Sequence, residues 1–252
     1  MHIYDTFIKG AGYSAFAYAL TRGNSLICES SHLCDPHFYG ALRGFSVEER
    51  EPQSALAKEF YILCKEQEIL KDGKLNVAAL ESVWCYYLKN KEYNLLLNTE
   101  CIEIKPENGL FKILISTNSG LEEVYAKNIF DTTALSSDKK YLAVLSTPVN
   151  EEILRSSFEG CVYDNAFYEN RMIIYIPTET DDINDAKVSV CDKWKENINN
   201  SQIISIAPCF AELYCNGFIF EKDHYLKASE GIFTSPFDAL EFGTQCGGDC
   251  ID

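Results

Sequence analysis

The first thirty residues carry a pattern of strand, turn, helix and strand. Residues 3–8 and 26–28 are strand-like runs, and residues 13–22 between them are rich in helix-forming residues. A helix that links two short strands is typical of the unit from which parallel sheets are built. We therefore expect residues 1–30 to open an α/β domain, with the second strand ending at Glu29.

The pattern then changes to two helices and a group of short strands. Stripes of apolar residues predict a helix over residues 54–71, stopped by Asp72-Gly73, and a second helix over residues 77–88. Alternating apolar residues separated by turn signals predict a three-stranded antiparallel β-meander over residues 101–125. We expect this meander to form a separate small layer against the parallel sheet.

The second half of the chain differs in character from the first. Residues 148–225 combine aromatic strand-like runs with a polar segment and a short helix, whereas residues 226–246 return to the style of the first unit. We therefore predict a discontinuous domain of residues 1–147 and 226–246, a smaller unit of residues 148–225, and a flexible tail of residues 247–252.

The net charge narrows the range of partners. The 252 residues include 38 acidic and 22 basic side chains, which gives a formal net charge of -16. Such a surface repels the phosphates of nucleic acids and of anionic membranes, so neither is an expected partner. No apolar run approaches the roughly 18 residues of a membrane span, and the first residues lack the pattern of a signal peptide. We therefore expect a cytoplasmic protein.

Most of the eleven cysteines are expected to be reduced thiols, because no secretion signal accompanies them. Their spacing relative to the four histidines does not match a metal site, and no metal is predicted. Cys246 and Cys250 lie in a glycine-rich tail, where they could form a disulfide, bind a metal or belong to a loose end.

The turn between the first strand and the first helix has the spacing of a dinucleotide fingerprint. Gly10, Gly12 and Ala15 match the pattern G-x-G-x-x-G/A, and Glu29 follows at the end of the second strand. The first glycine permits a tight turn, the second lets a pyrophosphate approach the backbone, and the small third residue lets helix and strand pack closely. An acid at the second strand end accepts hydrogen bonds from a ribose diol. The alternative is a glycine-rich turn that binds nothing.

With these elements in this order, the chain resembles the FAD-dependent oxidoreductases of the glutathione-reductase-like superfamily, as a short and partly degenerate member. The resemblance covers residues 1–134 and 226–246. The meander and a segment with Ser235 as helix N-cap before Pro236 carry it beyond the fingerprint. It implies an α/β fold, with a three-layer FAD/NAD(P)-binding Rossmann-like domain that contains a β-meander, and a small α+β substrate or cap unit.

The resemblance also implies FAD as the cofactor and a set of residues around it. In the family, the glycine turn binds the pyrophosphate, the acid binds the adenosine ribose, and the later strand ends lie beside the cofactor. The implied cofactor-binding residues are Gly10, Gly12, Tyr13, Ser14, Ala15, Glu29, Ser30, Cys101, Thr132, Thr133, Ala134, Gly231, Ser235 and Phe237.

The chain departs from the family pattern at several of these positions. Lys9 precedes the first glycine where an apolar residue is usual, Ala134 replaces a glycine, and Glu230-Gly231 is the nearest match to a Gly-Asp pair. Such departures are typical of a flavoprotein that has become degenerate or depends on a partner.

The irregular segment of residues 30–52 supplies the candidates for chemistry near the flavin. His37 has a side chain whose ordinary pKa lies near neutrality, which suits an acid or base. Arg43 could bind a substrate carboxylate through two hydrogen bonds. The alternative is that both are solvated loop residues.

Three functions remain open at this point. The first is an FAD-binding oxidoreductase that acts on a small-molecule substrate. The second is a non-catalytic or accessory subunit that keeps the flavoprotein fold and works through a protein partner or as a homo-oligomer. The third, a nicotinamide-dependent dehydrogenase of simple doubly wound type, is disfavoured, because that fold needs a helical crossover where residues 101–125 predict strands.

Overall fold

The computed structural model describes residues 2–43, 46–47, 50–133, 139–213 and 219–248. Its larger sheet has the strand order β14-β15-β8-β1-β2-β5. The central strands run parallel, and β14 pairs antiparallel with β15 at one edge. These strands are β1 (Ile3–Lys9), β2 (Ser25–Cys28), β5 (Asn94–Leu96), β8 (Gly120–Asp131), β14 (Ile219–Lys222) and β15 (Tyr225–Ala228).

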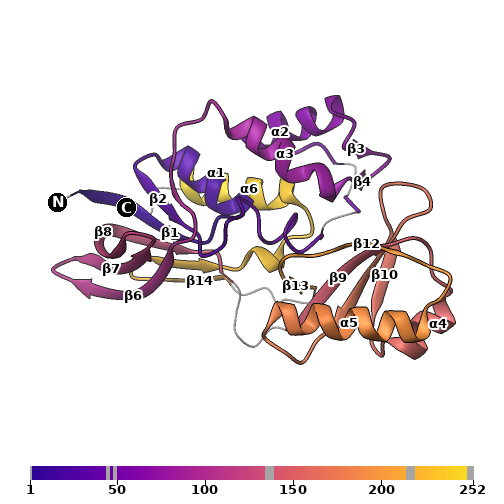
Figure 1. Ribbon diagram of the computed structural model, residues 1–252. Coiled ribbons are helices and arrows are strands. Elements are labelled where there is room, and N and C mark those ends of the chain that lie inside the picture. The colour runs from indigo at the N-terminus through magenta and orange to yellow at the C-terminus, as the bar shows by residue number, and fades with distance from the viewer. Residues whose placement is uncertain (1, 44–45, 48–49, 134–138, 214–218, 249–252) are drawn as a thin grey trace.

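Helices cover one face of this sheet and the meander covers the other, which confirms the predicted α/β fold with three layers (Figure 1). Along β1, Ile8 packs into the core on the helix side, whereas its neighbour Phe7 packs against the meander. The helices are α1 (Tyr13–Arg22), α2 (Ala55–Glu66), α3 (Val77–Leu88) and α6 (Pro236–Gly248). The meander consists of β6 (Glu100–Glu107), β7 (Leu110–Thr117) and the first half of β8.

The meander forms a layer of its own, but it is joined to the parallel sheet rather than separate from it as the sequence predicted. The long strand β8 pairs with β7 over residues 120–126 and with β1 from Tyr125 to Asp131. One continuous strand therefore belongs to both layers and fixes the meander against the parallel sheet.

The predicted helix over residues 54–71 is wrong at its end. Helix α2 stops at Glu66, and the chain turns into a hairpin of β3 (Leu70–Lys71) and β4 (Lys74–Leu75). Asp72 and Gly73 both have positive φ, 50° and 68°, as a two-residue hairpin turn requires. Asp-Gly therefore acts here as a hairpin turn rather than as a helix stop.

A second, antiparallel sheet forms the smaller α+β unit, with helices against one face (Figure 1). Its order is β10-β11-β9-β12, with β13 also paired to β9. This sheet begins at Lys140, and the chain re-enters the larger sheet at Ile219, so both changes come earlier than the residues 148 and 226 indicated by the sequence. The elements are β9 (Lys140–Ser146), α4 (Glu151–Ser157), β10 (Val162–Asn165), β11 (Met172–Pro177), α5 (Ile183–Asn197), β12 (Ile203–Ile206) and β13 (Ala211–Glu212).

Helix α6 packs against α1 at a very short distance because glycines face α1. A β-carbon at Gly243 would lie 2.1 Å from the backbone oxygen of Ser14, and one at Gly247 would lie 3.0 Å from the backbone oxygen of Tyr18. The predicted N-cap of α6 is confirmed, since the Ser235 hydroxyl accepts a hydrogen bond from Asp238 N–H at 3.2 Å. Gly247 and Gly248 belong to α6, and the rest of the predicted tail lies outside the described residues.

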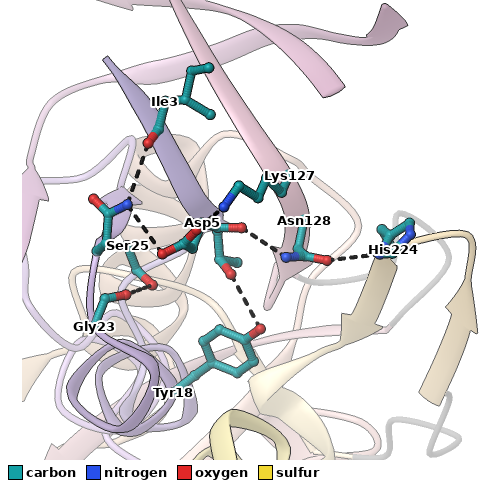
Figure 2. Close-up of polar contacts among 10 residues, drawn as sticks. Ile3, Asp5, Tyr18, Gly23, Ser25, Lys127, Asn128 and His224 are labelled. Carbon is teal, nitrogen blue, oxygen red and sulfur yellow. Dashed lines mark hydrogen bonds and ion pairs between the residues drawn. The ribbon is translucent and has the colours of Figure 1, made fainter. Parts of the chain in front are cut away.

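A polar network ties β1 to its neighbours near the amino end of the sheet (Figure 2). Lys127 Nζ lies 2.7 Å from a carboxylate oxygen of Asp5, and Asn128 donates to the Asp5 carbonyl at 2.8 Å. The hydrogen bond from Lys127 lowers the pKa of Asp5. Because Gly10 follows the opposite end of β1, this network supports the fold and is remote from the candidate site.

None of the helices in the described part of the chain combines the length and the apolar character that a membrane span requires.

Candidate functional site

Three parallel strands, β1, β8 and β15, end side by side, and their following residues form the base of the site. Thr132, just after β8, donates its N–H and its hydroxyl to the Lys9 carbonyl at 2.8 and 3.1 Å. The Thr132 carbonyl accepts from Glu230 N–H at 3.1 Å, just after β15. Gly10 has φ 99°, and a β-carbon there would lie 2.4 Å from the Thr132 hydroxyl oxygen. Gly10 is therefore required for both the turn and the close approach of Thr132.

Beside these strand ends lies a pocket of about 420 Å³, which we call the Glu29 pocket. It collects six of the residues predicted for the site: Gly10, Glu29, Ser30, His37, Cys101 and Thr133. Its other lining residues are Lys9, Cys28, Ser31, Pro36, Thr99, Glu100 and Cys209.

Glu29 is the acid that the fold holds most firmly in this pocket. Its side chain is 6% exposed, and its two carboxylate oxygens accept hydrogen bonds from Ala11 N–H at 2.9 Å and Ser31 N–H at 2.8 Å. The Ser30 hydroxyl also donates to the oxygen that accepts from Ser31, at 3.4 Å. Because a carboxylate oxygen has two lone pairs, the oxygen bound to Ala11 keeps the capacity to accept from a ribose hydroxyl. The glycine turn and the Glu29 carboxylate are thus locked together as one unit.

The thiols of the pocket are not activated. Burial raises the pKa of Cys28 to about 12 and that of Cys209 to about 11, and burial also raises the pKa of Cys101. Thiols in this state are protonated at neutral pH and are therefore poor nucleophiles. Among the described residues, no group of three or more His, Cys, Asp or Glu side chains could hold a metal ion.

The segment that follows Glu29 is compact, and a buried acid organises it. Both Asp35 carboxylate oxygens accept backbone hydrogen bonds at 2.9 Å, one from Phe38 N–H and one from Tyr39 N–H. Burial raises the pKa of Asp35 to about 6 in spite of these bonds. The segment also contacts the smaller unit, because the Gly40 carbonyl accepts from Cys209 N–H at 2.9 Å. The wall of the Glu29 pocket is therefore shared between the two units.

The two residues predicted for chemistry, His37 and Arg43, have different surroundings and different roles. His37 lines the Glu29 pocket, and burial together with the charge of Arg43 lowers its pKa to about 3, so its imidazole is neutral at pH 7. Arg43 is outside this pocket and 7% exposed, and its guanidinium donates to the carbonyls of Gly231 and Phe233 at 3.1 Å each. In this arrangement Arg43 fixes the C-terminal segment against the loop.

The amino end of α1 is occupied by a side chain of the protein itself. Helix α1 has Gly12 as N-cap and no acidic residue in its first turn. Glu230 supplies an acid from the far end of the sequence, since its carboxylate accepts from Ser14 N–H at 2.7 Å and from the Ser14 hydroxyl. A β-carbon at Gly12 would lie 2.3 Å from three atoms of the Glu230 side chain. We call the backbone of Gly12 and the N–H of Ser14 the phosphate subsite.

The remaining predicted residues serve packing or local structure. The Tyr13 ring is buried in a cluster with Phe38, Phe60 and Trp84, at centroid distances of 4.5 to 5.7 Å. Phe237 extends the same cluster, 5.9 Å from the ring of Phe60. Further residues with such roles are the buried Ala15, Gly231, which accepts from Arg43, and Ser235, the N-cap of α6. Ala134 lies outside the described residues.

The site fits the adenosine ribose of FAD but does not fit its pyrophosphate. The Glu29 pocket offers a buried acid beside the glycine turn, as an adenosine ribose requires. The phosphate subsite does not fit a pyrophosphate in this structure, because the Glu230 carboxylate lies against Gly12 and takes the hydrogen bond of Ser14 N–H. In the sequence, Glu230 differs from a family motif, but its contact with α1 was not predicted. The available signal was the lack of an acid in the first turn of α1.

Burial raises the pKa of Glu230 from 4.5 to about 7. The folded protein therefore binds a proton at Glu230 more tightly than the unfolded chain does. This contribution to stability is fully present below the unfolded value and is lost as the pH rises to about 7.

We expect the free energy of unfolding of the wild type, relative to the Glu230→Gln variant, to fall by a few kcal/mol between about pH 5 and about pH 8. Denaturant unfolding of both proteins at each pH measures it. Taking the difference removes the titration of groups that do not interact with Glu230, whereas Asp35, whose charge raises the pKa of Glu230, contributes to the measured difference. A difference that does not change with pH would contradict the assignment to Glu230.

Two larger hollows lie away from the strand ends. One borders α5 in the smaller unit, near Lys139 and Thr178, and the other borders the β3–β4 hairpin, near Lys71 and Tyr168. Neither contains a residue of the glycine turn or a predicted site residue, so size alone does not identify the site.

No protein-family model matches the chain, and no curated protein matches it in sequence. Solved structures do match its fold. The p-nitrophenol 4-monooxygenase PnpA from Pseudomonas putida aligns with 98% of this chain and 78% of its own, with a TM-score of 0.56 and 12% identity. A flavoprotein/dehydrogenase from Cytophaga hutchinsonii aligns with 98% of this chain and 77% of its own, with a TM-score of 0.54 and 12% identity.

The aromatic hydroxylase CabE from angucycline biosynthesis aligns over 97% of this chain with a TM-score of 0.56 and 11% identity. This chain spans 62% of CabE, less than two thirds of its length. At such identities the likeness concerns the fold. The chain has the FAD/NAD(P)-binding Rossmann-like fold that the glycine turn, the meander and the strand order indicate, and it shares that fold with these oxidoreductases.

Proposed function

We propose that this chain is an FAD-binding protein with a redox role, and that the Glu29 pocket holds the adenosine part of the cofactor. The observation that carries the proposal is the Glu29 carboxylate, which is buried at the end of β2 and hydrogen-bonded to the glycine turn. A buried acid beside such a turn is suited to a ribose diol and would repel a 2′-phosphate. The flavin, once bound, would supply the redox chemistry, and the protein would bind and orient it.

The fold of the neighbouring structures supports this proposal. The printed descriptions of these proteins include a monooxygenase, an aromatic hydroxylase and a flavoprotein/dehydrogenase. A small-molecule substrate is the corresponding expectation for this chain. The neutral His37 imidazole at the edge of the pocket is available as a hydrogen-bond partner and is a weak base, since burial lowers its pKa to about 3.

A second function is favoured by Glu230. A protein whose own carboxylate fills the phosphate subsite would suit an accessory subunit that keeps the flavoprotein fold without its cofactor. Such a subunit would act through a protein partner or as a homo-oligomer.

Identification of the released cofactor separates these two functions. We expect protein that has been saturated with FAD and desalted to retain it, and mass spectrometry of the denatured sample to find FAD rather than NAD. A parallel sample incubated with NAD serves as the control. Retention of neither dinucleotide by a folded protein would favour the accessory subunit.

A further inference from the structure

The amino end of α1 needs an acceptor that its own sequence does not provide. Its N-cap is a glycine without a side chain, and its first turn contains no acid. The first turn of a helix exposes unpaired N–H groups and the positive end of the helix dipole, which together attract an anion. In a dinucleotide-binding protein that anion is the pyrophosphate of the cofactor.

In this structure the place of that anion is taken by the side chain of Glu230, whose pKa of about 7 makes it a carboxylate in mildly alkaline solution. Its carboxylate takes the hydrogen bonds of the N–H and the hydroxyl of Ser14, and the residue is 0% exposed. The second carboxylate oxygen has no hydrogen-bond partner and is buried as well. Burying an oxygen without a hydrogen-bond partner costs free energy. The hydrogen bonds of the first oxygen to Ser14 therefore hold the Glu230 side chain in this position.

The backbone of Glu230 is fixed independently of its side chain. Its N–H donates to the Thr132 carbonyl at 3.1 Å, and the residue starts a short 3₁₀ turn that is capped by the Ser229 hydroxyl, which accepts from Gly231 N–H at 3.2 Å. The hydrogen bonds that hold the backbone at this point therefore do not involve the Glu230 carboxylate.

The same atoms explain why residue 12 is a glycine. A β-carbon at Gly12 would lie 2.3 Å from Cγ, Cδ and Oε1 of Glu230. The space that the fingerprint keeps free for a phosphate is thus filled by the Glu230 side chain. A pyrophosphate would also add negative charge beside Glu29, Asp35 and Glu230, which are all buried here. The two anions cannot occupy the subsite together.

We propose that Glu230 is a resident anion of the phosphate subsite, which competes with the pyrophosphate of a dinucleotide and must leave α1 before the cofactor binds. This inference rests on the proposed function for the identity of the competing ligand. Whether an internal carboxylate fills the phosphate subsite can be tested without FAD.

The test uses inorganic pyrophosphate as the probe at about pH 8, where the Glu230 carboxyl group is ionised. Calorimetric titration and thermal melting are applied to the wild type and to the Glu230→Ala and Glu230→Gln variants. We expect Glu230→Ala to bind pyrophosphate at least tenfold more tightly than the wild type, and to be stabilised by it. Glu230→Gln keeps the volume of the side chain, and its amide oxygen can still accept from Ser14, so it is expected to stay close to the wild type.

Equal binding of pyrophosphate by the wild type and Glu230→Ala, or by neither, would overturn the inference. If Glu230→Ala folds only when pyrophosphate is present, that rescue supports it. If Glu230→Ala does not fold at all, Glu230→Asp replaces it, because a carboxylate shorter by one methylene should bind Ser14 less well and let pyrophosphate compete more effectively.

Adding FAD to the same titrations distinguishes the two proposals. FAD binding that is at least tenfold tighter for Glu230→Ala than for the wild type supports both. Pyrophosphate binding by Glu230→Ala without FAD binding would leave the competition at the subsite intact and remove FAD as the ligand.

Discussion

Replacement of Gly243 by alanine is expected to lower the free energy of unfolding by about 3 kcal/mol, at the upper end of what overpacking costs. The new β-carbon would lie 2.1 Å from the backbone oxygen and 2.8 Å from the Cα atom of Ser14. These are backbone atoms of α1, so no side-chain rotation relieves the contact and α6 must move away from α1. Ser14 is also the residue that binds Glu230, so the damage extends to the phosphate subsite.

Gly248→Ala in the same helix is the matched control for this prediction. A β-carbon there would lie 3.9 Å from its nearest neighbour, a methyl carbon of Thr21, which is an ordinary contact. Urea unfolding of the two variants and the wild type measures the difference. Equal stabilities of the two variants would show that α1 and α6 are not packed as closely as described.

The part of the fold that could be predicted from sequence is the part set by neighbouring residues. The glycine turn, the helix after it and the strand that ends at Glu29 lie within thirty residues, and each has a local signal. Ser235 before Pro236 marked the start of α6 for the same reason. Local patterns therefore located the glycine turn and the acid that line the Glu29 pocket.

Local patterns were ambiguous where one signal serves two structures. Asp72-Gly73 can end a helix or turn a hairpin, and the buried strand residues Leu70 and Leu75 decide for the hairpin through tertiary packing. Tyr13 lies inside the fingerprint, yet its ring faces the aromatic core around Trp84 rather than the pocket. Both outcomes depend on contacts that the sequence spacing does not encode.

The contact of Ser14 with Glu230 could not have been predicted from spacing. It joins residues that are 216 positions apart, on elements at opposite ends of the chain. The sequence showed an unusual acid after the last strand, but whether a glutamate there points to solvent, to a flavin or to α1 depends on the assembled sheet. The structure supplies the strand order that places β15 near β1, with β8 between them.

The Glu29 carboxylate is expected to be the strongest single determinant of FAD affinity in the pocket. Loss of a charge-assisted acceptor for the ribose hydroxyls costs about 1.5–3 kcal/mol, or roughly tenfold to a hundredfold in the dissociation constant. Because Glu29 also accepts from Ala11 and Ser31, the variant of choice is Glu29→Gln, which keeps the size of the side chain and one acceptor oxygen. Glu100→Gln is the matched control, since Glu100 lines the same pocket with an exposed side chain.

The most direct measurement is therefore a titration of FAD into the wild type, Glu29→Gln and Glu100→Gln, repeated in the Glu230→Ala background where the phosphate subsite is open. An increase of roughly tenfold to a hundredfold in the dissociation constant for Glu29→Gln, with Glu100→Gln unchanged, is the expected result in both backgrounds. Equal FAD affinities of the wild type and Glu29→Gln, or no FAD binding by any of the proteins, would contradict the assignment of the Glu29 pocket to the adenosine of FAD.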